Sequence, residues 1–181
     1  MELLELPVFY IINKGYGQEE THILNSNSKD WKNDDFMDAY SNEGIKDYEI
    51  YREFKKEYGF GHREVQNMLL GTQGVQYDHF FRSGKFEIKN LDGARRSAEK
   101  ILMCKDLYAT NPVLGYKRRS FVNALLIAFG NPDYEHSVFI RKLKYQRTKL
   151  VDCTNEKQYL MIIEEVYNYN NKKTTKTLRL F

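Results

Sequence analysis

Side chains that commonly carry catalysis or bind metals are few in this sequence and lie far apart. The chain contains four histidines, His22, His62, His79 and His136. None of them stands near cysteines or carboxylates at the spacing of zinc ligands. The two cysteines, Cys104 and Cys153, lack the basic helix-start setting that activates a thiolate, and we expect both to be ordinary buried thiols. The sequence therefore predicts no metal site.

Two glycine-containing segments resemble fragments of phosphate-binding loops. They are Gly-Tyr-Gly at 15–17 and Gly-Phe-Gly at 59–61. Neither belongs to the longer Walker or dinucleotide-binding pattern, and the serine-nucleophile pattern G-x-S-x-G is absent from the sequence. These segments are typical of turns, and we expect a non-enzymatic protein without catalytic residues or a cofactor.

Positive charge is concentrated in the middle of the chain. Residues 1–84 contain 9 Lys+Arg against 15 Asp+Glu, residues 85–149 contain 14 against 6, and residues 150–181 contain 5 against 4. The whole chain carries only +3. A basic part attracts phosphate, and an acidic part attracts basic protein surfaces. Alternatively, the two parts neutralise each other across an internal interface.

A basic cluster, Lys117-Arg118-Arg119, opens the most apolar predicted helix, and Arg95 and Arg96 precede it in the sequence. Cations at the start of a helix oppose the helix macrodipole, so an anion near them would be stabilising. The phosphate backbone of a nucleic acid is such an anion. Salt bridges to the acidic N-terminal part are the alternative.

A helix-turn-helix-like arrangement is predicted in the centre of the chain. Residues 63–70 and 75–82 have the pattern of two short helices, and a glycine-containing turn at 71–74 separates them. In such a motif the second helix enters the major groove of DNA.

The predicted contacts of this motif with nucleic acid are made by Arg82 on the second helix and by Lys85 and Lys89 on a following wing. The wing is suggested by the alternation of apolar and charged residues over 85–89. The alternative is an ordinary helical hairpin with the Phe-Phe pair at 80–81 in the core.

The remaining pattern predicts an α+β fold that is predominantly helical. Short strands are expected at 7–12, where β-branched and aromatic residues cluster, at 85–89, and at the edge-forming tail from Leu178 to Phe181. Helices are expected at 33–43, 47–58, 62–70, 75–82, 90–108, 116–129, 134–146 and 155–169. We predict two domains, residues 1–84 and a basic domain at 85–181 that ends in a helical bundle.

The sequence also predicts a cytoplasmic protein without a membrane partner. No segment approaches the roughly 20 apolar residues that a membrane span needs. The first twelve residues contain acids where a secretory signal would carry Lys or Arg.

The segment from Leu4 to Tyr40 resembles the N-terminal domain of ParB proteins, which has the ParB/sulfiredoxin-like fold. Residues 6–11, Leu-Pro-Val-Phe-Tyr-Ile, are similar to a strand of that family that reads like VPVIV. Residues 24–31 take the place of the polar family motif that follows, with Asp35, Ala39 and Tyr40 in register after it. The rest of the chain looks like phage and mobile-element proteins that carry such a domain.

The departures from this family imply that its nucleotide chemistry is lost. ParB-like domains bind nucleotide through a Gly- and Arg-rich segment before that strand, and we expect it to be missing here. The motif Glu that helps to hold a metal corresponds to Leu24, and the motif Arg corresponds to Ser28. Such a site would lack most charge-assisted contacts to phosphate, so we expect no nucleotide hydrolysis.

We therefore expect a truncated phage or mobile-element relative that binds DNA or RNA, or a nucleoprotein nuclease such as a CRISPR effector. Its most specific form is an inhibitor of a host CRISPR nuclease. The alternatives are a ParB-like DNA-binding accessory or transcriptional regulator and, third, a vestigial nucleotide-binding enzyme. The predicted binding residues are Arg82, Lys85, Lys89, Arg95, Arg96, Lys117, Arg118 and Arg119.

Overall fold

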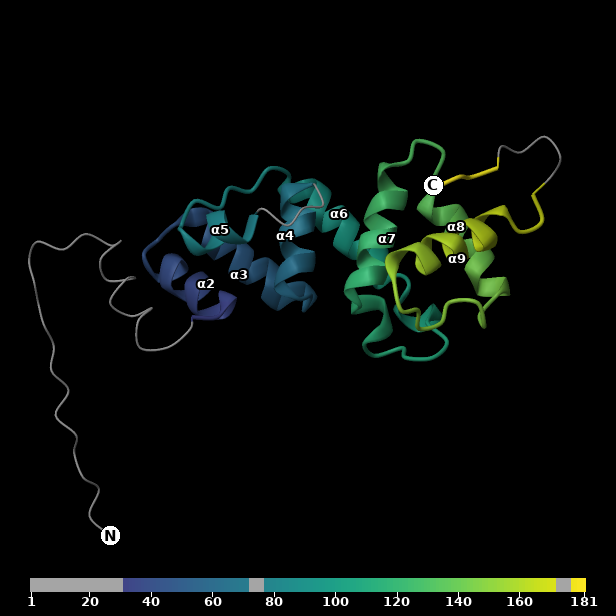
Figure 1. The fold of residues 1–181 in the computed structure, drawn as a ribbon, viewed down its shortest axis with the longest axis horizontal. Coiled ribbons are helices and arrows are strands. Elements are labelled where there is room, and N and C mark those ends of the chain that lie inside the picture. The colour runs from purple at the N-terminus through teal and green to yellow at the C-terminus, as the bar shows by residue number, and fades with distance from the viewer. Residues whose placement is uncertain (1–30, 72–76, 172–176) are drawn as a thin grey trace, which may run out of the picture.

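A computed structural model describes residues 31–71, 77–171 and 177–181. These residues form α-helices joined by loops and short 3-10 helices (Figure 1). The α-helices are α2 (Asn33–Asn42), α3 (Lys46–Tyr58), α4 (His62–Leu70), α5 (Tyr77–Arg82), α6 (Leu91–Leu102), α7 (Arg119–Gly130), α8 (His136–Tyr145) and α9 (Glu156–Asn168). The 3-10 helices are η1 (Lys105–Leu107) and η2 (Gly115–Lys117).

The predicted α+β class is wrong for the described part of the chain, which contains no strand. The strand expected at 7–12 lies outside the described residues. None of the described helices is both long enough and apolar enough to cross a membrane.

The helices form an N-terminal half, α2 to α5, and a C-terminal half, α7 to α9, with α6 leading from one to the other (Figure 1). Helix α4 packs against α3, α6 and α7, so the two halves meet around it. Its residues from Glu64 to Leu70 are all buried, as expected for a helix covered on every side. The predicted domain boundary between residues 84 and 85 stays a prediction.

The segment 85–89 has the predicted alternation, yet it is not a strand. Phe86 is buried and Ile88 is half-buried, while the lysines at both ends are exposed. The backbone N–H of Phe86 donates to the Tyr48 hydroxyl at 3.3 Å, and that of Ile88 donates to the Asp47 carboxylate at 3.2 Å. Because side chains of α3 satisfy these donors, the segment needs no neighbouring strand.

The core of the N-terminal half is built around Tyr48, which is 0% exposed. Its ring lies 4.8 Å from that of Tyr40, 5.2 Å from that of Phe81 and 6.0 Å from that of Phe86, measured between centroids. Its hydroxyl donates to the Phe81 carbonyl oxygen at 2.6 Å. Tyr48 thus fastens α3 to the end of α5 and to the segment that follows it.

A second pair of tyrosines holds the C-terminal half together. The hydroxyls of Tyr108 and Tyr159 are hydrogen-bonded to each other, and both rings pack on Phe121 of α7 at 5.4 and 5.2 Å between centroids. The Tyr159 hydroxyl also accepts the backbone N–H of Cys153 at 3.0 Å. These contacts fix the loop before α7 and the loop before α9.

Two predicted element ends differ from the structure. The helix predicted over 90–108 begins after its Asn90 cap but ends at Leu102, and the chain turns there so that Tyr108 reaches the core. The tail does dock, with Leu178 buried, but it is not an edge strand. The Leu178 backbone bonds instead to the side-chain amide of Asn168, at 2.8 and 2.9 Å.

Replacing Tyr48 by phenylalanine should destabilise the protein by about 1–3 kcal/mol, because the buried Phe81 carbonyl and Phe86 N–H each lose a partner. Urea unfolding followed by circular dichroism measures this change. The control is Tyr145→Phe on an exposed tyrosine, which should stay within about 0.5 kcal/mol of the wild type. Equal effects of the two substitutions would contradict the role given to the Tyr48 hydroxyl.

Stability should fall in mild acid because of His136, whose side chain is buried against Phe129 at the start of α8. Burial lowers the pKa of His136 from 6.5 to about 4. As the pH falls below 6.5 the unfolded chain takes up a proton that the folded protein binds only near pH 4, so stability is lost across this window, by on the order of 3 kcal/mol. Urea midpoints at several pH values should therefore slope less for His136→Phe than for the wild type. Parallel curves would contradict the assignment.

Candidate nucleic-acid interface

A carboxylate, an imidazole and a hydroxyl line up in the N-terminal half, in an arrangement that the sequence did not suggest. The Asp34 carboxylate lies 2.9 Å from Nε2 of His62, and Nδ1 of His62 lies 3.0 Å from the Tyr51 hydroxyl. Both imidazole nitrogens are therefore occupied, and the Tyr51 side chain is fully buried. Burial also lowers the pKa of His62. The arrangement links α2, α3 and α4 and leaves no group free to attack a substrate.

Of the two cysteines, which were both predicted to be buried, Cys104 is buried and Cys153 is half-buried. Cys104 is completely buried, which raises the pKa of its thiol far above the usual range, and Cys153 is also a free thiol. Residues 31–71, 77–171 and 177–181 hold no group of three or more His, Cys, Asp or Glu side chains arranged to bind a metal ion.

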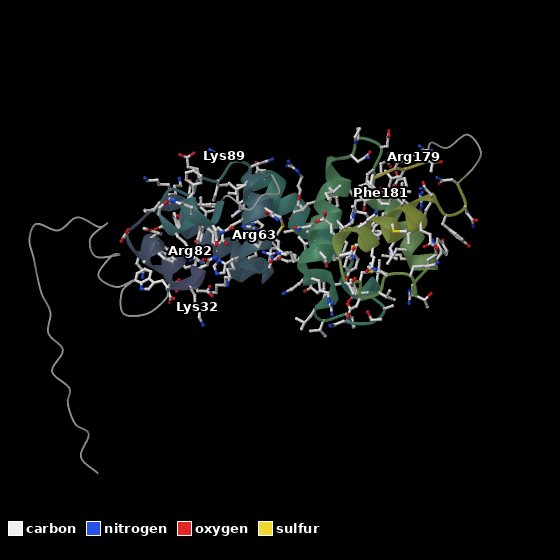
Figure 2. All side chains as sticks on the ribbon, in the orientation of Figure 1. Lys32, Arg63, Arg82, Lys89, Arg179 and Phe181 are labelled. Atoms are coloured by element: carbon white, nitrogen blue, oxygen red, sulfur yellow. The ribbon has the colours of Figure 1, made fainter. Side chains whose placement is uncertain are left out.

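Arg82 and Lys89, two predicted contacts of the helix-turn-helix-like motif, each bind a carboxylate of this chain. Arg82 lies 3.7 Å from Asp78, and its guanidinium stands over the Phe36 ring at 5.8 Å. Lys89 lies 2.6 Å from Glu87. The two cations lie apart on the N-terminal half in Figure 2, so they do not form one surface.

The helices of that predicted motif exist as α4 and α5, but the predicted turn at 71–74 lies outside the described residues after Gly71. Helix α5 has six residues and buries Phe81 completely, while Phe80 is half exposed. The alternative, an ordinary helical hairpin with both phenylalanines in the core, is thus correct for Phe81 and not for Phe80. The DNA-binding interpretation stays a prediction.

The two arginines of the basic cluster at 117–119 form ion pairs with carboxylates of the same chain. Arg118 lies 2.8 Å from Asp152, in the loop before α9. Arg119 lies 3.7 Å from Glu64 of α4, so the bridge to the acidic N-terminal part that was the alternative is present. The carboxylates supply the negative charge that a helix start favours.

The amine of Lys117 also has contacts within the chain. Its amine lies over the Tyr116 ring at 5.6 Å and against Gly59, at the carboxyl end of α3. The negative end of the α3 dipole stabilises a cation in that position.

The three remaining predicted cations are exposed but dispersed. Lys85, Arg95 and Arg96 make no ion pair with any residue that the structure describes. Arg95 and Arg96 follow each other on α6, whereas Lys85 borders a depression beside Phe80, in the N-terminal half. The predicted residues therefore do not combine into one interface.

The end of α8 carries a cationic surface that the sequence interpretation missed. Residues 141–149 contain five Lys+Arg and no Asp or Glu. Arg141, Lys144 and Arg147 are exposed and make no ion pair within the described part of the chain. Tyr145, which lies among them, is 83% exposed. We call these four residues the α8 surface.

The two faces of α8 explain this surface. Phe139, Ile140 and Leu143 are buried, and α8 packs on α9. Arg141 is followed by Lys144 three positions later and by Tyr145 four positions later, so these side chains share the outer face of the helix. The i, i+3, i+4 spacing together with the charge density of 141–149 is the sequence signal that could have found them.

The two other cations of this segment are paired and do not belong to the surface. Lys142 donates to the Tyr167 carbonyl oxygen and to Asn171, which ties the end of α8 to the end of α9. Lys149 is paired with Glu165 of α9. Lys142 and Lys149 thus stabilise the packing of α8 and of the following loop on α9, whereas the cations of the α8 surface make no ion pair with the described residues.

Comparisons with known proteins give no information on which of these cations bind a partner. No protein-family model, no curated protein and no solved structure matches this chain. The resemblance of residues 4–40 to ParB-like domains stays a prediction, and most of that segment lies outside the described residues. The candidate interface therefore rests on the geometry of the α8 surface.

Proposed function

We propose that this chain is a non-enzymatic protein that binds nucleic acid through the α8 surface. The observation that carries the proposal is the group of three exposed cations around the exposed Tyr145 that make no ion pair with any described residue. Cations of this kind bind phosphates and release the counterions condensed on the nucleic acid. Ion-paired cations such as Arg118 contribute less, because they must first give up the partner that they hold.

Single-stranded nucleic acid is the form that this surface fits best. An exposed tyrosine ring offers a flat face on which an unpaired base can stack, whereas the bases of a duplex are already stacked on each other. The cations on either side of Tyr145 would hold the phosphates of the same strand. The described residues of the N-terminal half contain more Asp and Glu than Lys and Arg, which disfavours nucleic acid at that end of the molecule.

Inhibition of a CRISPR nuclease is the narrower form of this proposal, and a ParB-like accessory or regulator of DNA is the other form. An inhibitor that holds a guide or a displaced strand through the α8 surface would block cleavage in a reconstituted reaction. An accessory protein would leave cleavage unchanged while it binds the same strand. The reconstituted assay therefore separates the two.

Removing two cations of the α8 surface should weaken nucleic-acid binding to the same extent for all sequences. For Arg141→Ala combined with Lys144→Ala, the negative slope of log affinity against log salt should become less steep by roughly 1.4 to 2, because two phosphate contacts are lost. Fluorescence anisotropy with a labelled oligonucleotide at several salt concentrations measures the slope. Lys46→Ala combined with Lys56→Ala is the charge-matched control, since both lysines are exposed on α3. Equal losses in the two variants, or no binding by the wild type at low salt, would contradict the proposal.

Removing the ring of Tyr145 should lower affinity for a single strand more than for a duplex. Base stacking on an aromatic side chain is worth about 1–3 kcal/mol, so Tyr145→Ala should weaken single-strand binding by about 5- to 150-fold. Binding to a duplex of the same length should change less than about twofold. Tyr169→Ala, at a tyrosine that is 47% exposed beyond α9, is the control and should leave both affinities unchanged. A parallel loss for strand and duplex would argue against stacking.

A further inference from the structure

The backbone of the segment 85–89 bonds to opposite sides at alternate residues. The N–H groups of Phe86 and Ile88 donate to side chains of α3. The N–H groups at the two ends of the segment donate instead to carbonyl oxygens of α5 and α4, at 2.9 and 3.0 Å. In an extended chain the N–H groups of every second residue point to the same side. The N–H group of Glu87 therefore faces α4 and α5, between these two bonds.

The backbone of Glu87 has no hydrogen-bond partner among the residues that the structure describes. Its N–H group donates to none of them, and its carbonyl oxygen accepts from none. Two antiparallel residues that face each other exchange both of these bonds, so an open donor beside an open acceptor fits one residue of another extended chain. The bonds at Lys85 and Lys89 close the stretch at both ends, about 13 Å apart in an extended chain. Only a short segment can therefore pair here.

An apolar depression of about 400 Å³ lies beside this open backbone. Leu70, Phe80 and Phe86 line it, together with the charged residues of the segment 85–89. Phe80 is 50% exposed, although phenylalanine is among the residues that are most often buried. An apolar side chain placed on this ring would remove apolar surface of both groups from water, which is favourable. The depression therefore suits an apolar side chain of the segment that pairs with Glu87.

The charges at the rim of the depression favour an acidic residue next to that apolar side chain. The Glu87 carboxylate is neutralised by Lys89, which lies 2.6 Å away. Lys85 is exposed and makes no ion pair with any described residue. One uncompensated positive charge therefore borders the depression, and opposite charges across an interface select the partner. A single carboxylate matches this rim, and an acidic tract does not.

We propose that this depression docks a short extended segment of a partner protein. One apolar residue of the segment exchanges two backbone hydrogen bonds with Glu87 and places its side chain on Phe80, and an acidic residue beside it meets Lys85. In this mode of recognition the main chain supplies affinity and the side-chain pocket supplies specificity. The docking site lies in the N-terminal half and α8 in the C-terminal half (Figure 1), so the proposal does not depend on the function of the α8 surface.

The test is titration of the full chain with a panel of short synthetic peptides that are blocked at both ends. Each peptide has a central Leu, Ile, Phe or Trp with one acidic residue beside it. At least one of them should bind, as measured by fluorescence anisotropy, and should move the NMR signal of the Glu87 amide proton to lower field, because that proton becomes hydrogen-bonded. The same peptide with lysine in place of the acidic residue should bind more weakly.

Backbone pairing is tested by removing the N–H group of Glu87. Glu87→Pro should weaken peptide binding about three- to tenfold, because proline has no N–H group and one hydrogen bond is lost. The matched control is Glu87→Ala, which keeps the N–H group and should bind at least as tightly as the wild type. Methylation of the backbone nitrogen of the peptide's central residue should cause a loss of similar size, and this measurement uses the unaltered protein.

The side-chain contacts are tested at Phe80 and Lys85. Phe80→Ala should weaken binding about tenfold or more, because the apolar contact is lost. Phe181→Ala, at a phenylalanine that is 65% exposed at the other end of the molecule (Figure 2), is the control and should leave binding unchanged. Lys85→Glu should weaken binding of the acidic peptides and strengthen that of the lysine peptides. The double substitution of Arg141 and Lys144 should leave peptide binding intact, which distinguishes this site from the α8 surface.

Other occupants of the depression give different results. If the Glu87 amide proton of the free protein already exchanges slowly with water, another part of this chain or a second copy covers the site, and the proposal is overturned. Faster exchange on dilution would identify the second copy. The proposal is also overturned if no peptide of the panel binds at millimolar concentration, if binding survives both Glu87→Pro and methylation of the peptide, or if Phe80→Ala binds as the wild type does.

Discussion

The structure depends on the rule that a buried tyrosine hydroxyl must be hydrogen-bonded. Fourteen tyrosines occur in this chain, and those that reach the core place a polar atom there. Tyr48 meets the rule by bonding the Phe81 carbonyl and the Phe86 N–H, and the Tyr108 and Tyr159 hydroxyls meet it through each other. In both halves the hydroxyls bind backbone groups of loops, which a neighbouring strand would otherwise have to satisfy. The hydroxyls are therefore the reason that extended segments can pack on helices without forming a sheet.

The meeting of the two halves around α4 follows from a second packing constraint. A helix buried on every side must also bury the polar residues of its sequence, and in α4 these include Glu64, Gln66 and Asn67. Glu64 forms an ion pair with Arg119 of α7, and the Asn67 amide donates to Asn123 of the same helix at 3.1 Å. Both amide atoms of Gln66 and the Oδ1 atom of Asn67 have no hydrogen-bond partner among the described residues. The polar side chains of α4 thus contribute to the contact between the two halves through Glu64 and the Asn67 amide nitrogen.

The sequence predicts the helices well and the site poorly, for physical reasons that differ. The spacing of Tyr48, Tyr51 and Phe54 predicts the buried face of α3, and Asn90 marks the start of α6 as expected. The segment 85–89 is wrongly predicted because alternation reports which side chains are buried and not whether the backbone has a strand partner. The partners of Arg118 and Arg119 lie far away along the chain and could not be read from local pattern. That the Glu87 N–H group has no partner among the described residues depends on all its neighbours, and only the folded structure contains that information.

The helix dipole explains which cations remain available to phosphate. At the start of α7 the dipole opposes a positive charge, and there Arg118 and Arg119 are held by carboxylates of this chain. At the end of α8 the dipole itself stabilises positive charge, so Lys144 stays in the last turn without an ion pair to any described residue and at little cost to the fold. The excess of Lys and Arg in 85–149 thus overstates the charge that a nucleic acid would meet, since part of it is neutralised inside the molecule. For α7 and α8, the two arginines at the helix start are thus paired with carboxylates of this chain, whereas Lys144 in the last turn makes no ion pair with any described residue.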